Sequence, residues 1–450
     1  MNLQQVKNVF FIGIGGIGMS AIARYFMQLG KNVSGYDKTP THLTNELQQE
    51  GISITFKDTL ESIADEFLNK EETLIVITPA IPKDHQQWNF FQQNGFTIKK
   101  RAEVLGMITA QSFSLAVAGT HGKTTTSSML AHIMYDNQTE VTAFLGGVLE
   151  NYQTNLIGKG TEITVVEADE FDRSFMHLHP NIACVISTDA DHLDIYHTTD
   201  AIKSTFQDFA DKITDTENLF VAENTQLKAG VKVGFSDQAD IQIKNVRVVE
   251  GAIVFDIQYP NLLIENVSLL MPGNHNILNA TLAFAMAHKY GLSAEQIKKS
   301  LATFTGVRRR FSYKVKEDNK VYIDDYAHHP TEINAVSQAV KQLYGDKKVL
   351  AIFQPHLFSR TRDFMDGFAE SLSSFDEIGL MEIYPARELP IEGVTSSVLL
   401  GKIKNPNKKL VQKDEIFSYI ESKDFDVLVT IGAGDIGEMV EEIAKKVKQK

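Results

Sequence analysis

The stretch Ser114-Leu-Ala-Val-Ala-Gly-Thr-His-Gly-Lys-Thr-Thr-Thr126 decides how the middle of this chain folds. Its apolar beginning, residues 114–118, predicts a buried strand. Gly119 and Gly122 then predict a turn, and apolar residues recur at helical spacing over residues 129–134. A strand, a glycine turn, a Lys-Thr pair and a helix in this order are typical of a phosphate-binding loop.

In such a loop the backbone N–H groups and the helix N-terminus bind a polyphosphate. Lys123 would reach the β- and γ-phosphates, and the hydroxyl of Thr124 would bind Mg²⁺. The match to the usual pattern is incomplete, because its first glycine falls at Val117. The alternative is a tight strand-to-helix turn with a surface lysine, which we judge weaker because strand, turn and helix agree.

Length and composition indicate a globular protein of two to four domains, since the chain has 450 residues and an ordinary apolar fraction. The net charge of −13 argues against nucleic acid as the main partner, although a nucleotide needs only a local positive site. Cys184 is the single cysteine and lies in an apolar run, which predicts a buried structural thiol and suits a reducing cytoplasm. We find no signal peptide and no membrane-spanning run, so we expect a cytoplasmic protein with no membrane partner.

The N-terminus begins with a βαβ pattern. An apolar strand at residues 8–14 runs into Gly13-Ile-Gly-Gly-Ile-Gly18, a helix follows, and a second strand at residues 32–36 ends at Asp37. This arrangement should hold a diphosphate near the glycines and a ribose hydroxyl near Asp37. The pattern does not separate a dinucleotide from a nucleoside-diphosphate sugar, and a purely structural turn is the further alternative.

Two later strands end in acidic residues. The strand over residues 163–170 ends in Glu167, Asp169 and Glu170, and Glu167 is our first choice for binding Mg²⁺. The strand over residues 181–187 is followed by His192 between carboxylates, which suggests a second metal ligand or a substrate-positioning group. The alternatives are a solvated acidic loop and a structural histidine.

Residues 231–272 lack a helical period, and short strands at 246–249, 252–258 and 266–270 predict antiparallel ribbons. A helix then opens with His275, Asn276 and Asn279. These are more polar side chains than one cap needs, so recognition of a base and plain capping both stay open. We place the domain boundaries near residues 108 and 306, the second at the basic cluster Gly306-Val-Arg-Arg-Arg-Phe311.

The last third alternates strands with helices again, and its strands at 321–325, 349–353, 378–383 and 426–431 each end in a polar loop. The second of these loops is predicted to run from Gln354 to Arg362, and a helix to follow it as far as Ser373. The arginines and histidines in the loops suit carboxylates, while the first two domains suit phosphates. This division favours a ligase, in which ATP phosphorylates a carboxylate and an amine attacks the acyl phosphate.

The chain resembles the Mur ligases of peptidoglycan synthesis over nearly its whole length. The resemblance rests on several motifs in the same order: Phe11-Ile-Gly-Ile-Gly-Gly-Ile-Gly-Met-Ser20, Gly119-Thr-His-Gly-Lys-Thr-Thr125, Glu167-Ala-Asp-Glu170, Asp191-His-Leu-Asp194, His275-Asn-Ile-Leu-Asn-Ala280, Arg309-Arg-Phe311, Asp325-Tyr-Ala-His-His-Pro-Thr331, Gln354-Pro-His356, Ser359-Arg-Thr-Arg362 and Tyr384-Pro-Ala-Arg-Glu388.

The resemblance implies an α/β fold of three domains. Residues 1–108 would be a Rossmann-like UDP-sugar domain, 109–306 a phosphate-loop ATPase-like domain with an antiparallel ribbon, and 307–450 a Rossmann-like amino-acid domain. It also implies ATP and Mg²⁺ as cofactors and L-alanine and UDP-N-acetylmuramate as substrates, in a monomer or weak homodimer.

Site residues follow from the same resemblance. The UDP-sugar would contact Gly13, Gly15, Gly16, Gly18, Asp37, Thr78, Ala80 and Arg101. ATP would contact Gly119, Thr120, His121, Gly122, Lys123, Thr124, Thr125, His275, Asn276, Asn279, Arg310 and Asp325. Thr124, Glu167 and His192 would bind metal, and the amino acid would contact Tyr326, His328, Arg360 and Arg387. The catalytic set would be Lys123, Glu167, His192 and Arg360.

The chain departs from the family pattern in places. Leu357 follows Gln-Pro-His where some relatives have arginine, so Arg360 must suffice for the carboxylate. Phe171-Asp-Arg173 follows the acidic motif where a small residue was expected, and we assign it no role. Lys203 lies near the place of a carbamylated lysine found in several members, but it does not align well enough to receive that role.

Three other hypotheses stay open. A recycling ligase of the same family would add a preformed tripeptide to UDP-N-acetylmuramate, but it should lack the motif pair at 354–362 and 384–388. A nicotinamide-dependent oxidoreductase built on Gly13–Gly18 would leave the phosphate loop without a role. An ATP-gated scaffold would hydrolyse ATP slowly and be indifferent to amino acids.

Overall fold

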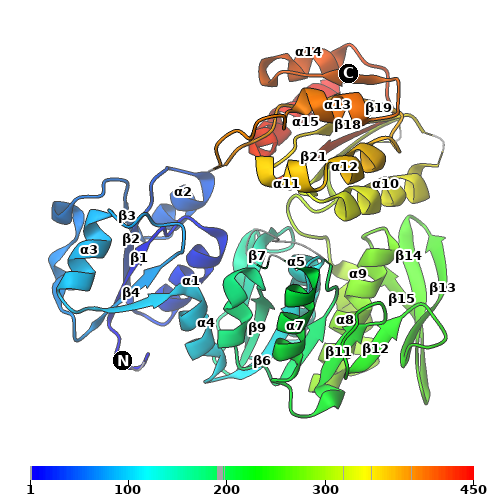
Figure 1. The fold of residues 1–450 in the computed structure, drawn as a ribbon. Helices are drawn as coiled ribbons and strands as arrows, with labels where there is room; N and C mark the ends of the chain where they lie inside the picture. The colour runs from blue at the N-terminus through cyan, green and yellow to red at the C-terminus, as the bar shows by residue number, and fades with distance from the viewer. Residues whose placement is uncertain are drawn as a thin grey trace. The chain divides into compact units, whose positions relative to one another are not determined.

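The computed structural model describes residues 3–189, 196, 198–317, 319–345, 347–386 and 388–449. Within these residues the strands form three sheets of five, ten and six strands, with helices packed on them (Figure 1). The predicted α/β class is confirmed. The chain divides into two compact units, one made of residues 1–247, 254–268 and 278–304, and the other of residues 248–253, 269–277 and 305–450.

The first sheet is parallel, in the order β3-β2-β1-β4-β5, and both of its faces are buried. Along β1 (Asn8–Ile12), Val9 and Phe11 belong to the apolar cluster of α1 (Ile17–Gln28), while Phe10 and Ile12 belong to that of α3 (Gln86–Gln93). Strand alternation therefore dictates the covering on both sides. The remaining elements are β2 (Asn32–Tyr36), α2 (His42–Gln49), β3 (Ser53–Thr55), β4 (Thr73–Ile77), β5 (Thr97–Lys100) and α4 (Arg101–Thr109).

The second sheet places the phosphate-binding loop at its centre. β6 (Phe113–Ala118) pairs in parallel with β9 (Ile163–Ala168) and β10 (Ile182–Val185), and α5 (Lys123–Asp136) follows the loop. Gly119 and Gly122 have φ of 141° and 82°, which favour glycine. The predicted strand, turn and helix are therefore present. The other strands of this sheet up to residue 234 are β7 (Val141–Leu149), β8 (Thr154–Gly158), β11 (Leu219–Ala222) and β12 (Val231–Gly234), and helix α7 (Thr199–Ala210) precedes β11.

The predicted ribbon is present but longer than expected, as β13 (Ile241–Val249), β14 (Ala252–Tyr259) and β15 (Leu262–Leu269). Glu250 and Gly251 have φ of 51° and 81°, as in a two-residue hairpin turn between antiparallel strands. The sequence analysis did not predict β12, which pairs in parallel with both β11 and β13. Strand periodicity carries no information on direction. Helices α8 (Asn274–Tyr290) and α9 (Ala294–Thr303) follow.

The third sheet has the order β16-β17-β21-β18-β19-β20 and is parallel except between β16 and β17. The helix predicted after Arg362 is confirmed as α12 (Met365–Leu372), but a short helix that was not predicted, α11 (Phe358–Asp363), lies in the expected loop and breaks off at Phe364. Phe364 has a φ of −118°, and its ring packs edge-on against His329 at 4.5 Å. A side-chain contact with a distant residue therefore accompanies the break.

The bounds of the other elements in this sheet complete the fold. They are β16 (Ser312–Glu317), β17 (Lys320–Asp325), α10 (Pro330–Tyr344), β18 (Val349–Phe353), β19 (Glu377–Leu380), α13 (Ser396–Lys402), β20 (Lys408–Leu410), α14 (Ile416–Glu421), β21 (Val427–Ile431) and α15 (Val440–Gln449). Helices α10 and α12 cover one face and α14 and α15 the other, each over its own apolar cluster.

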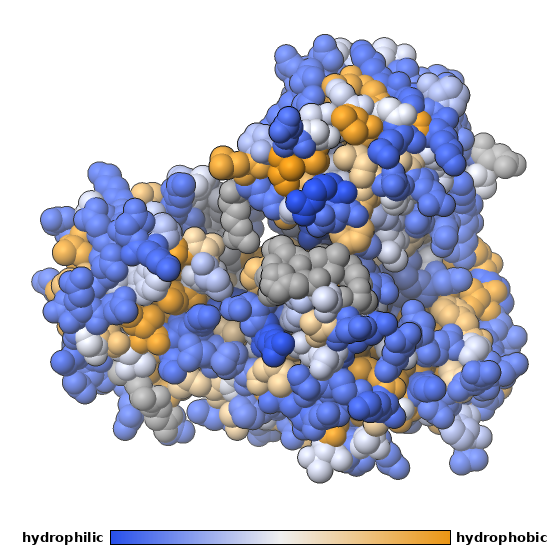
Figure 2. Space-filling view, in the orientation of Figure 1, coloured by the Kyte–Doolittle hydropathy of each residue, from blue (hydrophilic) through white to orange (hydrophobic). Residues whose placement is uncertain are grey.

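The visible face of the molecule carries mostly hydrophilic residues, with apolar residues in scattered groups (Figure 2). Among the described residues, none of the helices is both long enough and apolar enough to cross a membrane.

Cys184 provides a simple test of the core. The residue has no exposed surface on β10, and burial raises the pKa of its thiol. Because only the thiolate reacts readily, we expect an aromatic disulfide reagent to titrate no thiol in the native protein and one in guanidinium chloride. Rapid reaction of the native protein would contradict this placement.

Candidate active site

Lys123 lies at the first position of α5 and is held by two oxygen atoms. Its Nζ donates to the carbonyl oxygen of Gly119 at 2.7 Å and to Oε2 of Glu170 at 2.6 Å. Burial alone would lower the pKa of Lys123, but Glu170, Asp169 and Glu167 together raise it. The lysine therefore stays protonated, and its ammonium group can donate to a phosphate oxygen in place of the carboxylate of Glu170.

The three carboxylates at the end of β9 have separate partners. Glu167 accepts hydrogen bonds from the hydroxyls of Thr124 at 3.3 Å and Ser127 at 3.2 Å, and from the N–H of Gly146 at 2.7 Å. Asp169 instead pairs with Arg101 at 3.4 Å, and Glu170 pairs with Lys123. Glu167 thus lies beside Thr124, while Asp169 and Glu170 each pair with a cation.

The positions of Thr124 and Glu167 fit Mg²⁺. This ion prefers oxygen ligands and keeps several waters or phosphate oxygens, so one or two protein groups are enough. A hydroxyl and a carboxylate at 3.3 Å supply them. No group of three or more His, Cys, Asp or Glu side chains suited to a metal occurs in the described part of the chain. His192, the third predicted ligand, lies outside the described residues.

The glycine loop of the first sheet and the phosphate loop of the second line one cavity of about 320 Å³. Ile17 and Gly18 contribute from the first turn of α1, Arg101 from α4, and Lys123 and Glu167 from the central domain. A Cβ on Gly18 would lie 3.0 Å from Nη1 of Arg101, so the glycine leaves room for this arginine side chain. One residue of each predicted phosphate site, Gly18 and Lys123, therefore lines the same cavity.

Asp37 braces the N-terminal glycine loop in this structure. Its carboxylate accepts hydrogen bonds from the N–H of Gly15 at 2.7 Å and of Thr39 at 3.2 Å. Gly13 has a φ of 88°, and a Cβ there would lie 2.5 Å from Cγ2 of Thr78. The predicted UDP-sugar residues Asp37 and Thr78 thus both lie against the loop, at the carboxyl edge that also carries Gly16 and Ala80.

The phosphate loop is tied to the end of β10 through Ser187, which the sequence analysis missed. The hydroxyl of Ser187 lies 2.9 Å from that of Thr120 and accepts the N–H of His121 at 2.9 Å. Nε2 of His121 is 3.7 Å from Asp189. Thr125 is buried within α5. The position of Ser187 after a strand next to β6 was the available signal for it.

The three residues predicted to contact adenine differ in their surroundings. Asn279 is buried beside the phosphate loop, since a Cβ on Gly122 would lie 2.7 Å from its Oδ1. The amide of Asn276 donates to the carbonyl oxygen of Pro272 at 2.7 Å, while His275 is exposed. Asn276 thus has a local structural role at the start of α8.

In the second unit, Asp325 ends β17 and is held by backbone groups. Its two carboxylate oxygens accept the N–H groups of Phe311 and Ala327, each at 2.7 Å. Burial raises the pKa of Asp325 to about 7, although the charge of Arg310 opposes the shift. The guanidinium of Arg310 lies 5.8 Å from the ring centre of Tyr326. The predicted residues Arg310, Asp325 and Tyr326 are therefore brought together.

Loops after β17, β18 and β19 meet around His356 and Tyr384, whose rings stack at 5.7 Å. Nη1 of Arg360 is 3.5 Å from Nδ1 of His356, and the ring of His328 lies 6.4 Å from that of His356. Tyr326, 5.4 Å from His328, completes the group. His356 and Tyr384 were not among the predicted site residues, although both follow a strand end. Arg387 lies outside the described residues.

Comparison with known proteins shows the class of this protein. The description "Mur ligase family, catalytic domain" matches residues 8–113, "Mur ligase middle domain" matches 117–287, and "Mur ligase, glutamate ligase domain" matches 309–434. The chain belongs to the Mur ligase family, whose members are ATP-dependent enzymes that form amide bonds.

Particular relatives narrow the similarity. The chain is 58% identical to the UDP-N-acetylmuramate–L-alanine ligase of Flavobacterium johnsoniae over 449 residues, and 58% identical to that of Flavobacterium psychrophilum over 450, covering 100% of every chain. It is also similar to the crystal structure of UDP-N-acetylmuramate-alanine ligase from Thermotoga maritima, with a TM-score of 0.83, 26% identity and coverage of 98% and 99%.

Substitution of Lys123 should affect both the ligation rate and the free energy of unfolding, and a second substitution should restore only the latter. Lys123→Ala deletes the predicted phosphate contact and should reduce ligation at least a hundredfold, as the loss of a transition-state donor does. It also removes the ion-pair partner of the buried Glu170, which should lower the free energy of unfolding by roughly 3 kcal/mol. Adding Glu170→Gln to this variant should restore urea resistance without restoring phosphate release. Undiminished turnover in Lys123→Ala would contradict the mechanism.

The titration of Asp325 is a second test. One ¹³C-labelled aspartate carboxyl should titrate near pH 7, and Asp325→Asn should remove that resonance shift. Since the folded carboxyl binds its proton more tightly than the unfolded one, stability should fall as pH rises from about 4 to 7 and then level off. Titration of all described aspartates near their ordinary pKa would contradict the assigned burial.

Proposed function

We propose that this chain joins the amino group of L-alanine to the carboxylate of UDP-N-acetylmuramate, using ATP. The observation that carries the proposal is the full-length similarity, at 58% identity, to enzymes named for this reaction. The cavity in which Gly18 and Arg101 face Lys123 and Glu167 supports it, because the reaction must bring a sugar nucleotide to the γ-phosphate of ATP.

The chemistry would proceed in two transfers. A carboxylate oxygen of UDP-N-acetylmuramate attacks the γ-phosphorus, the bond to the β–γ bridging oxygen breaks, and ADP leaves. The uncharged amine of L-alanine then attacks the acyl carbon, the bond to the phosphate breaks, and one proton is released as the amide forms. Exclusion of water protects the acyl phosphate between the steps.

The residues of the phosphate loop would serve the first transfer. Lys123 would exchange its contact with Glu170 for the β- and γ-phosphates and stabilise the charge of the transferring group. Thr124 and Glu167 would hold Mg²⁺, which neutralises phosphate charge, with His192 as a further proposed ligand. Around them, the loop residues 119–125 and Asn279 would contact ATP, and we retain the predicted roles of His275, Asn276, Arg310 and Asp325.

The sugar nucleotide and the amino acid would bind to different domains. We propose that the N-terminal glycine loop and Arg101 bind the UDP-sugar, with Asp37, Thr78 and Ala80 beside them. Tyr326, His328, Arg360 and Arg387 would bind L-alanine or neutralise the acyl phosphate. His356 joins this set because it lies between His328 and Arg360.

The domain division at residues 108 and 306 belongs to the same proposal, with one domain for each substrate. A cytoplasmic enzyme that acts as a monomer or weak homodimer fits it, since all three substrates are small and water-soluble.

Release of phosphate from ATP tests the function directly. With Mg²⁺ and UDP-N-acetylmuramate present, we expect release with L-alanine and little with L-Ala-γ-D-Glu-diaminopimelate. Reactions lacking the UDP-sugar, the amino acid or Mg²⁺ serve as controls. Release that needs the tripeptide in place of L-alanine would assign the chain to the recycling branch, and release indifferent to both would contradict ligation.

A further inference from the structure

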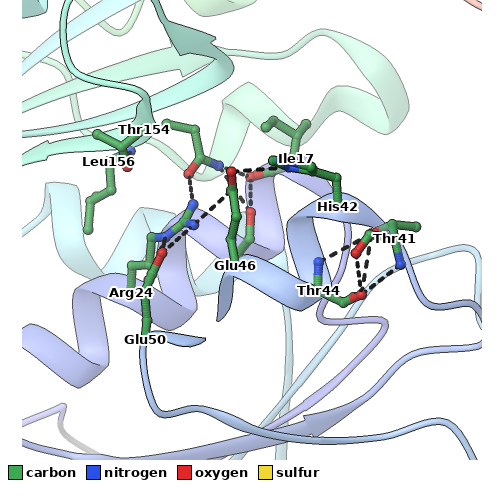
Figure 3. Close-up of polar contacts among 11 residues, drawn as sticks. Ile17, Arg24, Thr41, His42, Thr44, Glu46, Glu50, Thr154 and Leu156 are labelled. Atoms are coloured by element: carbon green, nitrogen blue, oxygen red, sulfur yellow. Dashed lines mark hydrogen bonds and ion pairs between the residues drawn. The ribbon is translucent and has the colours of Figure 1, made fainter. Parts of the chain in front are cut away.

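Arg24 lies almost completely buried on α1, at the contact between the first sheet's helices and the central domain. Its Nε donates to the two carboxylate oxygens of Glu50 at 3.0 and 2.8 Å, and Nη2 donates to Glu50 at 2.6 Å and to Glu46 at 3.3 Å. Figure 3 shows the guanidinium between Glu50 and the strand segment of Thr154 and Leu156. Two sides of the guanidinium are thus fixed from α2.

The remaining nitrogen of Arg24 reaches across to Asn155 on β8. Nη1 donates to Oδ1 of Asn155, which has no exposed surface. The amide nitrogen of Asn155 donates in turn to the carbonyl oxygen of Ile17 at 2.6 Å and to the hydroxyl of Ser20 at 3.0 Å. The side chain of Asn155 on β8 therefore binds the first turn of α1 directly, and it binds the middle of α1 through Arg24.

The surrounding contact is apolar. Tyr25 packs edge-on against Phe144 at 5.2 Å, and Ile22 shares one buried cluster with Phe144 and Leu156. Apolar burial resists separation but has no direction, so it permits small slides of one surface over another. Hydrogen bonds with fixed geometry prevent such slides. A buried network of charges is only weak evidence that the network stabilises the fold. We therefore assign it the role of fixing the geometry of this contact.

The turn held by Asn155 is the turn that faces the proposed reaction centre. Ile17 and Gly18 line the cavity with Lys123 and Glu167. We propose that Arg24 and Asn155 are positioning residues that fix the first turn of α1, and the sugar nucleotide bound there, relative to the phosphate loop. This inference rests on the proposed function for the identity of the substrate. A displacement of about 1 Å between reacting groups can reduce a rate a hundredfold.

Asn155→Asp tests the proposal with a change of similar shape. The carboxylate still accepts a hydrogen bond from Arg24, but it no longer donates to Ile17. We expect kcat at saturating substrates to fall about tenfold to a hundredfold, while the KM for ATP stays within about twofold of the parent because the phosphate loop is untouched.

Asn137→Asp is the matched control. The amide of Asn137, at the end of α5, also donates to a helix carbonyl, that of Ile133 at 2.8 Å, and to a serine hydroxyl, that of Ser300 at 3.0 Å. The chemical change is the same, but this contact lies within the central domain. Because Asn137 is partly exposed, we expect a smaller loss of thermal stability and an unchanged kcat. An equal fall of kcat in both variants would overturn the positioning role.

A distance measurement tests the contact without turnover. Lys70 and Asp208 are exposed on the two domains, and Cys184 is buried, so Lys70→Cys and Asp208→Cys direct spin labels to known positions. The label-to-label distance distribution should shift or broaden in Asn155→Asp and stay unchanged in Asn137→Asp. An unchanged distribution in Asn155→Asp would overturn the proposal, whereas absence of turnover in the parent would contradict only the proposed substrate.

Arg24→Lys covers the case in which Asn155→Asp does not fold. Lysine keeps a positive charge beside Glu46 and Glu50 but cannot reach three partners at once. We expect the label-to-label distance distribution to shift or broaden as in Asn155→Asp. We also expect kcat to fall while the KM for ATP stays within about twofold of the parent. A variant with parental distances and parental kcat would refute the role of Arg24.

Discussion

The parallel pairing of β6 with β9 is the constraint on which the rest of the site depends. The register places Val117 beside Glu167 and Ala118 beside Ala168, so the phosphate loop and the acidic motif leave the sheet side by side. The positive end of α5 and Lys123 then face three carboxylates within a few residues. Opposite charges at one sheet edge give Lys123 a carboxylate partner in Glu170, while Glu167 accepts a hydrogen bond from Thr124.

The first sheet and the central sheet do not have separate cores. Residues of α1, β1 and β4 belong to the same apolar cluster as residues of β6, β9 and β10. Compactness accordingly assigns the first 247 residues to one unit. This shared cluster joins the two parts of the chain that we propose hold the acceptor and the phosphoryl donor. The cavity between Gly18 and Lys123 depends on it.

Much of this site could be predicted because its parts are local. The loop at 119–125, the glycines at 13–18 and the acidic strand end each combine a strand pattern with short-range turn chemistry. Partner choice could not be predicted in the same way. Nothing in the order Glu167-Ala-Asp-Glu170 indicates that Asp169 faces Arg101 while Glu170 faces Lys123. The same limit applies to the break at Phe364, where the ring contacts the distant His329, and to the parallel pairing of β12 with β11.

The sequence by itself determined the class of fold, the phosphate loop and the family, because strand and helix periods, glycine turns and ordered motifs are properties of neighbouring residues. The tertiary structure alone decided which carboxylate meets which cation and that Asp37 braces Gly15. It also decided that His356 joins His328 and Arg360, and that Asn155 grips the first turn of α1. Each of these contacts joins residues from different elements, and their distances follow from how sheets and helices pack.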